Sequence, residues 1–184
     1  MHKVLATIAV FCLVASAMAA DLPEAWAQQR QQFSFTAPLG TSKYEEQHVI
    51  DVGDVPGHQL RVFSTHTVYS QEAPAFDGVK VKEAWQRAMS DYTNLSGRAN
   101  GYYVYAMDNG DKVFARWEGL TQTTINPDGS KASETWGVTT LTGGTGKFKG
   151  LRGTLHDSSK VDFKGSPLPS SPTVGEYWFE QSVS

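Results

Sequence analysis

The chain has 184 residues, of which 40% are hydrophobic and 19% charged, with 17 glycines, one cysteine and a formal net charge of −3. This hydrophobicity and small net charge exclude a disordered chain, and a single cysteine excludes a disulfide-rich scaffold. The slightly acidic balance gives no basic surface for nucleic acid, and the length suits one domain.

Residues 1–19 have the pattern of a secretory leader. A positively charged start precedes an apolar run over Val4–Val14, and Ala17-Met18-Ala19 is a small-x-small cleavage pattern. The apolar run is shorter than the roughly 20 residues that a transmembrane helix needs. The sequence therefore predicts a cleaved signal peptide and a secreted or periplasmic protein with no membrane span.

Residues 20–43 are expected to form a short helix and a lead-in to the main domain. Asp21 stands three residues before Glu24, which is the spacing of a capping box, and Pro23 suits a first helical turn. One helical stripe would carry Leu22, Ala25, Trp26 and Gln29. A disordered N-terminal tail is the alternative.

Residues 44–184 alternate between turn signals and runs rich in Val, Thr, Tyr, Phe and Trp. The turn signals are Asn100-Gly101, Asn109-Gly110 and Pro127-Asp128-Gly129. The runs predict eight strands, near 44–52, 58–70, 79–92, 101–107, 111–124, 131–142, 153–163 and 174–183. Short turns favour an antiparallel meander, and closing it would remove exposed edges. The predicted fold is therefore all-β, an eight-stranded antiparallel β-barrel behind a short N-terminal helix.

Period-2 alternation places aromatic or aliphatic side chains beside single ionisable groups on several of these strands. A small barrel of this kind can enclose one ligand in a mostly apolar cavity with a few polar groups. The candidate ligand-binding residues are His66, Tyr103, Arg116, Trp136, Glu176 and Trp178. The candidate catalytic residues are Glu118 and Glu134, as acid or base, and Tyr105, as a hydrogen-bond donor.

The same residues also fit a solvated outer face. Arg116 and Glu118 would then form an ordinary ion pair, and Glu134 and Glu176 would make ordinary salt bridges. His66 stands among valines and would be a satisfied core histidine. Because histidine side chains exchange protons near neutral pH, it also stays a candidate acid or base.

Motifs for metal, nucleotide or serine-hydrolase chemistry are missing from the sequence. The histidines that follow the leader lack metal-ligand spacing, and no G-x-S-x-G occurs. The lone cysteine, Cys12, falls within the leader, so a mature chain would have no thiol. In the Gly-rich run that starts at Gly143, Phe148 stands where a phosphate loop needs Ser or Thr, so we interpret the run as a tight turn. No cofactor is expected.

That Gly-rich run carries a family resemblance. Gly143-Gly144-Thr145-Gly146-Lys147-Phe148-Lys149-Gly150-Leu151-Arg152-Gly153 resembles the G-G-T-G-x-F-x-x-x-x-G segment of dirigent proteins and the allene oxide cyclase-like β-barrels. Val174-Gly175-Glu176-Tyr177 resembles their closing strand, so the likeness covers about residues 95–183. The resemblance implies an eight-stranded barrel, often trimeric, with a cavity open at one end. It also implies cofactor-free cyclisation or coupling of a reactive hydrophobic substrate. The cysteine pair of plant dirigent proteins is missing, which points to a bacterial branch.

Two functions follow from these patterns. The first is an exported barrel that binds a small hydrophobic or aromatic molecule, with a cofactor-independent isomerase or cyclase as its enzymatic form. The second is a non-catalytic exported protein that acts through protein contacts or as a homo-oligomer, with side chains filling its barrel. A cavity lined by Trp136, Tyr105 and Glu118 would favour the first, and a packed interior the second.

Overall fold

The described part of the chain is almost entirely β-structure. The computed structural model describes residues 29–38, 41–69, 72–162 and 171–180. The elements in these ranges are β1 (Gln31–Phe35), β2 (Ser42–Asp51), β3 (His58–Val68), β4 (Ala75–Phe76), β5 (Val79–Thr93), β6 (Ser96–Met107), β7 (Lys112–Ile125), β8 (Lys131–Gly144), the 3₁₀ turn η1 (Gly146–Phe148), β9 (Leu151–Asp162) and β10 (Thr173–Phe179). None of these ranges contains a helix long and apolar enough to cross a membrane. The expected leader over residues 1–19 and the expected helix around Asp21 lie outside the described residues.

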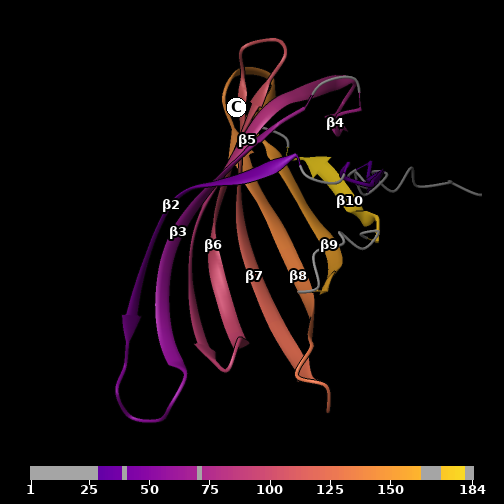
Figure 1. Cartoon of the computed structure of the whole chain (residues 1–184). Coiled ribbons are helices and arrows are strands. Elements are labelled where there is room, and N and C mark those ends of the chain that lie inside the picture. The colour runs from indigo at the N-terminus through magenta and orange to yellow at the C-terminus, as the bar shows by residue number, and fades with distance from the viewer. Residues whose placement is uncertain (1–28, 39–40, 70–71, 163–170, 181–184) are drawn as a thin grey trace, which may run out of the picture.

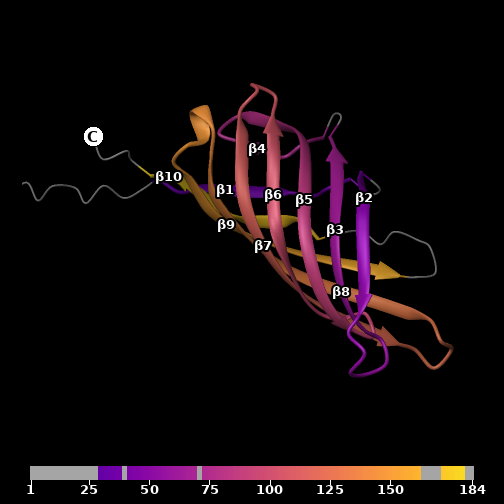
Figure 2. The same ribbon diagram turned by 90° about the vertical axis from the view of Figure 1, so that its left-hand side faces the viewer.

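The strands form one antiparallel sheet that curls without closing. Neighbouring strands follow the order β1-β10-β9-β8-β7-β6-β5-β3-β2, and β4 pairs only with the start of β5. The sheet therefore ends at β1 and β2, and no ladder joins these two edges among the described residues. In Figure 1 the strands lie close together at the end of the sheet that carries the β6–β7 turn, which we call the narrow end, and they fan out toward the other end. Figure 2 shows the curl of the sheet from the side. The expectation of a closed eight-stranded barrel is wrong, and the fold is an open half-barrel.

The lengths of the two edge strands explain why the sheet stays open. β1 has 5 residues, and all of them pair with β10. β2 has 10 residues, and all of them are exposed. A strand as short as β1, already paired on one side, cannot cover an edge of that length. A β-bulge between Tyr44 and Glu46 also interrupts β2, and bulges bend a strand away from regular pairing.

Most predicted strands and two of the three predicted turns are confirmed. Asn109-Gly110 lies in the turn between β6 and β7, and Pro127-Asp128-Gly129 lies between β7 and β8. The turn predicted at Asn100-Gly101 is wrong, because both residues lie inside β6. The chain instead turns at Asn94-Leu95, where both residues have positive φ angles of 52° and 67°. The sequence prediction also missed β1 and β4.

The hydrophobic core fills the narrow end of the half-barrel. Strand alternation turns the side chains of β1, β7, β8, β9 and β10 into this space, and η1 adds Phe148 from the Gly-rich turn. The most enclosed members are Phe76, Val81, Val113, Leu141, Phe148 and Leu151. The first two glycines of the Gly-rich run thus end β8, and the predicted tight turn follows them in η1, which delivers one core aromatic residue.

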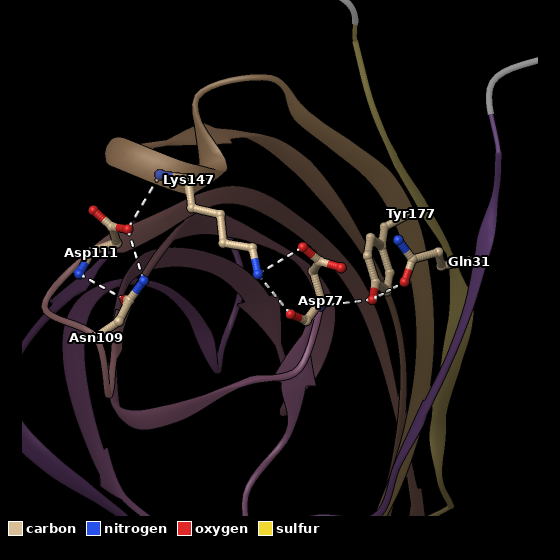
Figure 3. Close-up of polar contacts among 6 residues, drawn as sticks. All are labelled: Gln31, Asp77, Asn109, Asp111, Lys147 and Tyr177. Atoms are coloured by element: carbon tan, nitrogen blue, oxygen red, sulfur yellow. Dashed lines mark hydrogen bonds and ion pairs between the residues drawn. The ribbon is translucent and has the colours of Figure 1, made fainter.

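A chain of polar contacts holds the elements of the narrow end together (Figure 3). The Tyr177 hydroxyl donates to Gln31 Oε1 at 2.7 Å and accepts from the Asp77 backbone N–H at 2.8 Å. Lys147 Nζ lies 2.8 Å from Asp77 Oδ2 and 2.9 Å from the Asp77 carbonyl oxygen. These bonds join β1, the β4–β5 turn, η1 and β10, so one side of the half-barrel is fixed where the strands converge.

A second carboxylate, from Asp111, orders the turn that contains η1 (Figure 3). Asp111 accepts hydrogen bonds from Asn109 Nδ2 at 2.9 Å and from the Lys147 backbone N–H at 3.2 Å. Gly146 has a φ angle of 48°, and a Cβ there would meet Asp111 Oδ1 at 2.1 Å. Both the backbone conformation and this close approach require glycine at the position.

Candidate functional site

A hollow of about 360 Å³ lies against the concave face of the sheet. It begins where the hydrophobic core ends, and residues from both ends of the sheet line it. The lining residues that carry aromatic or polar side chains include Phe33, Phe35, Thr65, Thr67, Tyr69, Phe76, Gln86, Tyr103, Tyr105, Thr139, Asp157, Ser158 and Ser159. We refer to this site as the concave hollow.

Several aromatic rings form part of its walls. Phe33 stacks on Phe76 with ring centroids 5.1 Å apart, and Tyr103 stacks on Tyr105 at 5.4 Å. Phe35 of β1 meets Tyr69, the residue after β3, edge to face at 5.8 Å. This last contact brings together side chains from the two ends of the open sheet. The hollow is thus enclosed by side chains where the backbone ladders leave a gap.

The two stacked tyrosines come from alternate positions of β6, which places both on the concave face. Burial raises the pKa of both hydroxyls well above the usual value for tyrosine, and the negative charge of Asp157 adds to the rise. Burial also raises the pKa of Tyr69 to about 12. All three hydroxyls are therefore neutral at physiological pH. Tyr103 and Tyr105 both line the hollow, and a neutral phenol can donate one hydrogen bond.

Asp157 places a carboxyl group in the lining of this aromatic hollow. It lies on β9 directly across from Gly137 of β8, which in turn pairs with Gly119 of β7. The Trp117 side chain lies over these two glycines, and its indole N–H donates a hydrogen bond to the Asp157 carboxylate. A Cβ on Gly137 would come within 2.5 Å of Trp117 Nε1 and 2.7 Å of both Asp157 oxygens. Because Gly119 and Gly137 have no side chains, the Trp117 ring has the space that this hydrogen bond needs.

The surroundings of Asp157 change its acidity. Burial raises the pKa of its carboxyl above the ordinary aspartate value, while the hydrogen bond from Trp117 and the neighbouring His156 partly oppose this rise. Burial thus disfavours the ionised form of Asp157, and the contacts with Trp117 and His156 compensate for only part of the lost hydration. The other polar groups of the hollow are neutral and include the Gln86 amide and the hydroxyls of Thr65, Thr67 and Thr139.

Only two of the predicted site residues, Tyr103 and Tyr105, reach the concave hollow. The other predicted residues alternate with hollow-lining or buried neighbours on their strands, which places them on the convex face. They are His66 on β3, Arg116 and Glu118 on β7, Glu134 and Trp136 on β8, and Glu176 and Trp178 on β10. Glu118 and Glu134 are thus separated from Tyr105 by the sheet itself, and the three do not form one site.

The convex residues have ordinary surface contacts. Glu134 lies 3.4 Å from Lys160, and Glu176 pairs with Arg30, whose guanidinium lies 4.4 Å from the centre of the Trp178 ring. The alternative interpretation of these two carboxylates as salt-bridge partners is therefore confirmed. The ion pairs of the described residues do not include one between Arg116 and Glu118.

His66 occupies a separate, half-buried place on the convex face. Its ring stacks on Trp85 at 4.8 Å with an interplanar angle of 4°, and its Nε2 lies 3.0 Å from Glu83 Oε2. A second hollow of about 510 Å³ lies beside this pair, between β2, β3 and β5. His66 is therefore a partnered histidine, although it is on the outside of the sheet and not in the core. Within the described ranges, no group of three or more His, Cys, Asp or Glu residues could hold a metal ion.

The sequence prediction missed Asp157, Gln86, Tyr69 and the phenylalanines of β1 and β4. One signal was available for Asp157, because it follows Leu155 at a period of two on a predicted strand. Its importance depends on the facing glycines and on Trp117, which are 20 or more residues away in the chain. Comparisons of the chain with protein-family models, with curated proteins and with solved structures give no match.

Proposed function

We propose that this protein binds a small, largely aromatic molecule in the concave hollow. The observation that carries the proposal is the hollow itself, an aromatic-walled space of about 360 Å³ with a few convergent polar groups. Small-molecule sites are typically preformed, mostly apolar and roughly 300–1,000 Å³ in volume. The stacked pair Tyr103–Tyr105 would offer ring faces to such a ligand, and the hydroxyls and Gln86 would orient it.

We propose binding, and not catalysis by Glu118 and Glu134. An acid or base must lie within hydrogen-bond reach of the reacting atoms. Glu118 and Glu134 are on the opposite face of the sheet from the hollow. A cofactor-independent isomerase or cyclase would have to rely on Tyr105 and Asp157, which do line it.

The same proposal includes export of the protein from the cytoplasm. The leader pattern over residues 1–19 supports export, so the ligand would be met outside the cytoplasm. The resemblance of the Gly143–Gly153 segment to allene oxide cyclase-like and dirigent proteins supports a hydrophobic or aromatic ligand held without a cofactor.

A matched pair of variants tests binding in the hollow. Thr67 lines the hollow, whereas the next residue of β3, Val68, is 55% exposed on the convex face. Thr67→Phe and Val68→Phe each add a phenyl ring, but only the first occupies ligand space. We expect the neutral probe N-phenylnaphthylamine to bind wild type and Val68→Phe alike, and Thr67→Phe weakly. The measurement is probe fluorescence during titration, and a lack of binding to wild type would refute the proposal.

A second candidate function is association of the protein through its convex face, and exposed apolar side chains on that face support it. Large apolar side chains with more than a third of their surface exposed are spread across this face, namely Val62, Met89, Tyr102, Phe114, Leu120, Trp136, Val138 and Val174. Exposed apolar side chains that adjoin one another, as Leu120 and Trp136 do across neighbouring strands, are a feature of interaction surfaces. Leu120 and Trp136 face each other on neighbouring strands, so Leu120→Glu places a charge at the centre of the patch. Light scattering should show an oligomer for wild type and a smaller species for the variant. A wild-type monomer at every concentration would refute this candidate.

A further inference from the structure

The described residues that line the concave hollow supply one negative charge and no positive charge. Asp157 is the one carboxylate among the described lining residues, and no Lys, Arg or His side chain stands beside it in the lining. None of the ion pairs between described residues includes Asp157. The hollow therefore presents a carboxylate that has no ion-pair partner among the described residues, in a lining that also carries aromatic rings.

We propose that the concave hollow selects a small organic cation, with an ammonium group held by Asp157 and an apolar body held against the aromatic walls. The inference rests on the proposed function, because it names the ligand class of the same site. A carboxylate together with the faces of aromatic rings is the chemistry that binds organic ammonium groups.

The geometry around Asp157 keeps its carboxylate in position for a ligand. The Trp117 indole N–H occupies one acceptor position, and the facing Gly137 leaves room for both oxygens to lie close to the sheet. A carboxylate has about four acceptor positions, so others remain for an ammonium group. The charge of Asp157 also reaches Tyr103 and Tyr105, since it contributes to the raised pKa of both hydroxyls. The carboxylate and the stacked rings thus border the same space.

Burial supplies the driving force for charge selection. A partly buried carboxylate loses hydration that only part of its surroundings replaces, and burial accordingly raises the pKa of Asp157. A cation in the hollow would replace the hydration that the Asp157 carboxylate has lost. A neutral ligand would remove more water from the carboxylate, and an anion would be repelled by it. Selectivity is therefore expected in the order cation, neutral molecule, anion.

Three ligands with one phenyl body test this order. Phenethylammonium is the cation, phenethyl alcohol its neutral analogue and hydrocinnamate the anion, and calorimetric titration near neutral pH gives the three Kd values. A charge-assisted hydrogen bond is expected to make the cation bind about 10- to 100-fold more tightly than the alcohol. Hydrocinnamate should show no binding in the same concentration range.

Two variants assign the effect to Asp157. Asp157→Asn keeps an oxygen that can accept from Trp117 but removes the charge, so phenethylammonium and phenethyl alcohol should bind it with similar Kd. Glu118→Gln removes one negative charge on the convex face and should retain the wild-type preference.

The outcomes separate this inference from the function on which it rests. If phenethyl alcohol or hydrocinnamate binds wild type as tightly as the cation, and Thr67→Phe blocks that binding, the hollow is a ligand site but not a cation site. An equal loss of cation binding in Glu118→Gln would mean that net charge and not Asp157 attracts the ligand. If none of these ligands nor N-phenylnaphthylamine binds, both proposals fail.

Discussion

The Trp117 indole N–H and the Asp157 carboxylate are joined by a hydrogen bond that spans strand β8, although 39 positions separate them in the chain. The bond passes over Gly137, which pairs with Gly119 on one side and with Asp157 on the other. It orients the Asp157 carboxylate in the lining of the concave hollow and connects the wall of that hollow across three adjacent strands.

Gly137→Ala should destabilise the protein by about 1–3 kcal/mol, because an added methyl group in a filled space forces its neighbours apart. The new Cβ would meet Trp117 Nε1 at 2.5 Å and the Asp157 oxygens at 2.7 Å, so these side chains would have to shift and give up their present contact. Urea unfolding followed by tryptophan fluorescence measures the effect. Thr140→Ala, on the exposed face of the same strand, is the control and should change stability little. Equal stabilities of Gly137→Ala and wild type would show that Trp117 and Asp157 are not tightly packed against Gly137.

Asp157→Asn should be more stable than wild type near pH 7, with the difference shrinking as the pH falls. The folded-state pKa of Asp157 is raised by burial, so its ionised form destabilises the fold at any pH above that value. Protonation on acidification removes this penalty from wild type, whereas asparagine never carries it. Denaturant unfolding of both proteins at about pH 7 and about pH 4 tests the sign. A difference that grows on acidification would contradict the raised pKa.

His58 should stabilise the β2–β3 hairpin in its charged form. Nδ1 lies 2.6 Å from Asp54 Oδ1 and Nε2 lies 2.8 Å from Asp91 Oδ1, and the imidazolium form can donate to both carboxylates at once. The hydrogen bond with Asp91, followed by that with Asp54, raises the pKa of His58 above 6.5. The stabilisation is therefore fully present below the unfolded-state pKa and is lost as the pH rises through the higher folded-state pKa.

Titration of the His58 ring by NMR measures this shift directly. Asp91→Asn removes the largest cause and should bring the pKa of His58 back toward 6.5. The stability difference between wild type and His58→Gln should be larger in mildly acidic than in alkaline solution. A pH-independent difference would mean that the ring acts through packing alone.

Phe76→Ala should destabilise the protein by about 3–5 kcal/mol, the range expected for removing a fully buried aromatic ring. Phe76 is 1% exposed, and its ring contacts those of Phe33, Tyr105 and Tyr177. Phe114→Ala is the matched control, because Phe114 is 37% exposed on the convex face. Thermal unfolding of the two variants should separate them clearly. Similar melting temperatures would show that β4 does not anchor the narrow end.

The local signals of the sequence predicted individual elements well where the chemistry of a turn is decisive. Asn109-Gly110 and Pro127-Asp128-Gly129 supply the backbone conformations that their turns need, and the strands beside them start and end close to the predicted positions. Asp77-Gly78 is an equally strong hairpin signal that was overlooked, and it forms the turn between β4 and β5 with φ angles of 48° and 78°. Asn100-Gly101 carries a similar signal, but pairing with strands on both sides holds it in β6.

For the candidate site, the sequence did not reveal which face of the sheet is concave. Alternation along β7 puts Trp117 on the face opposite Arg116 and Glu118, but it does not tell which of the two faces is concave. Both faces of β7 mix apolar and polar side chains, and the convex face keeps Phe114 and Leu120 more than a third exposed. The ionisable residues chosen from the sequence therefore fell on the outside, while Asp157 was passed over.

The sequence by itself determined the all-β class and the position of most strands, because alternation and turn chemistry act between residues close together in the chain. Tertiary structure alone decided that the sheet stays open and which face surrounds the hollow. Those features depend on ladders between distant segments, such as β1 with β10, and on contacts such as Phe35 with Tyr69. Such pairings are set by the length and curvature of the whole sheet, which no single stretch of the chain encodes.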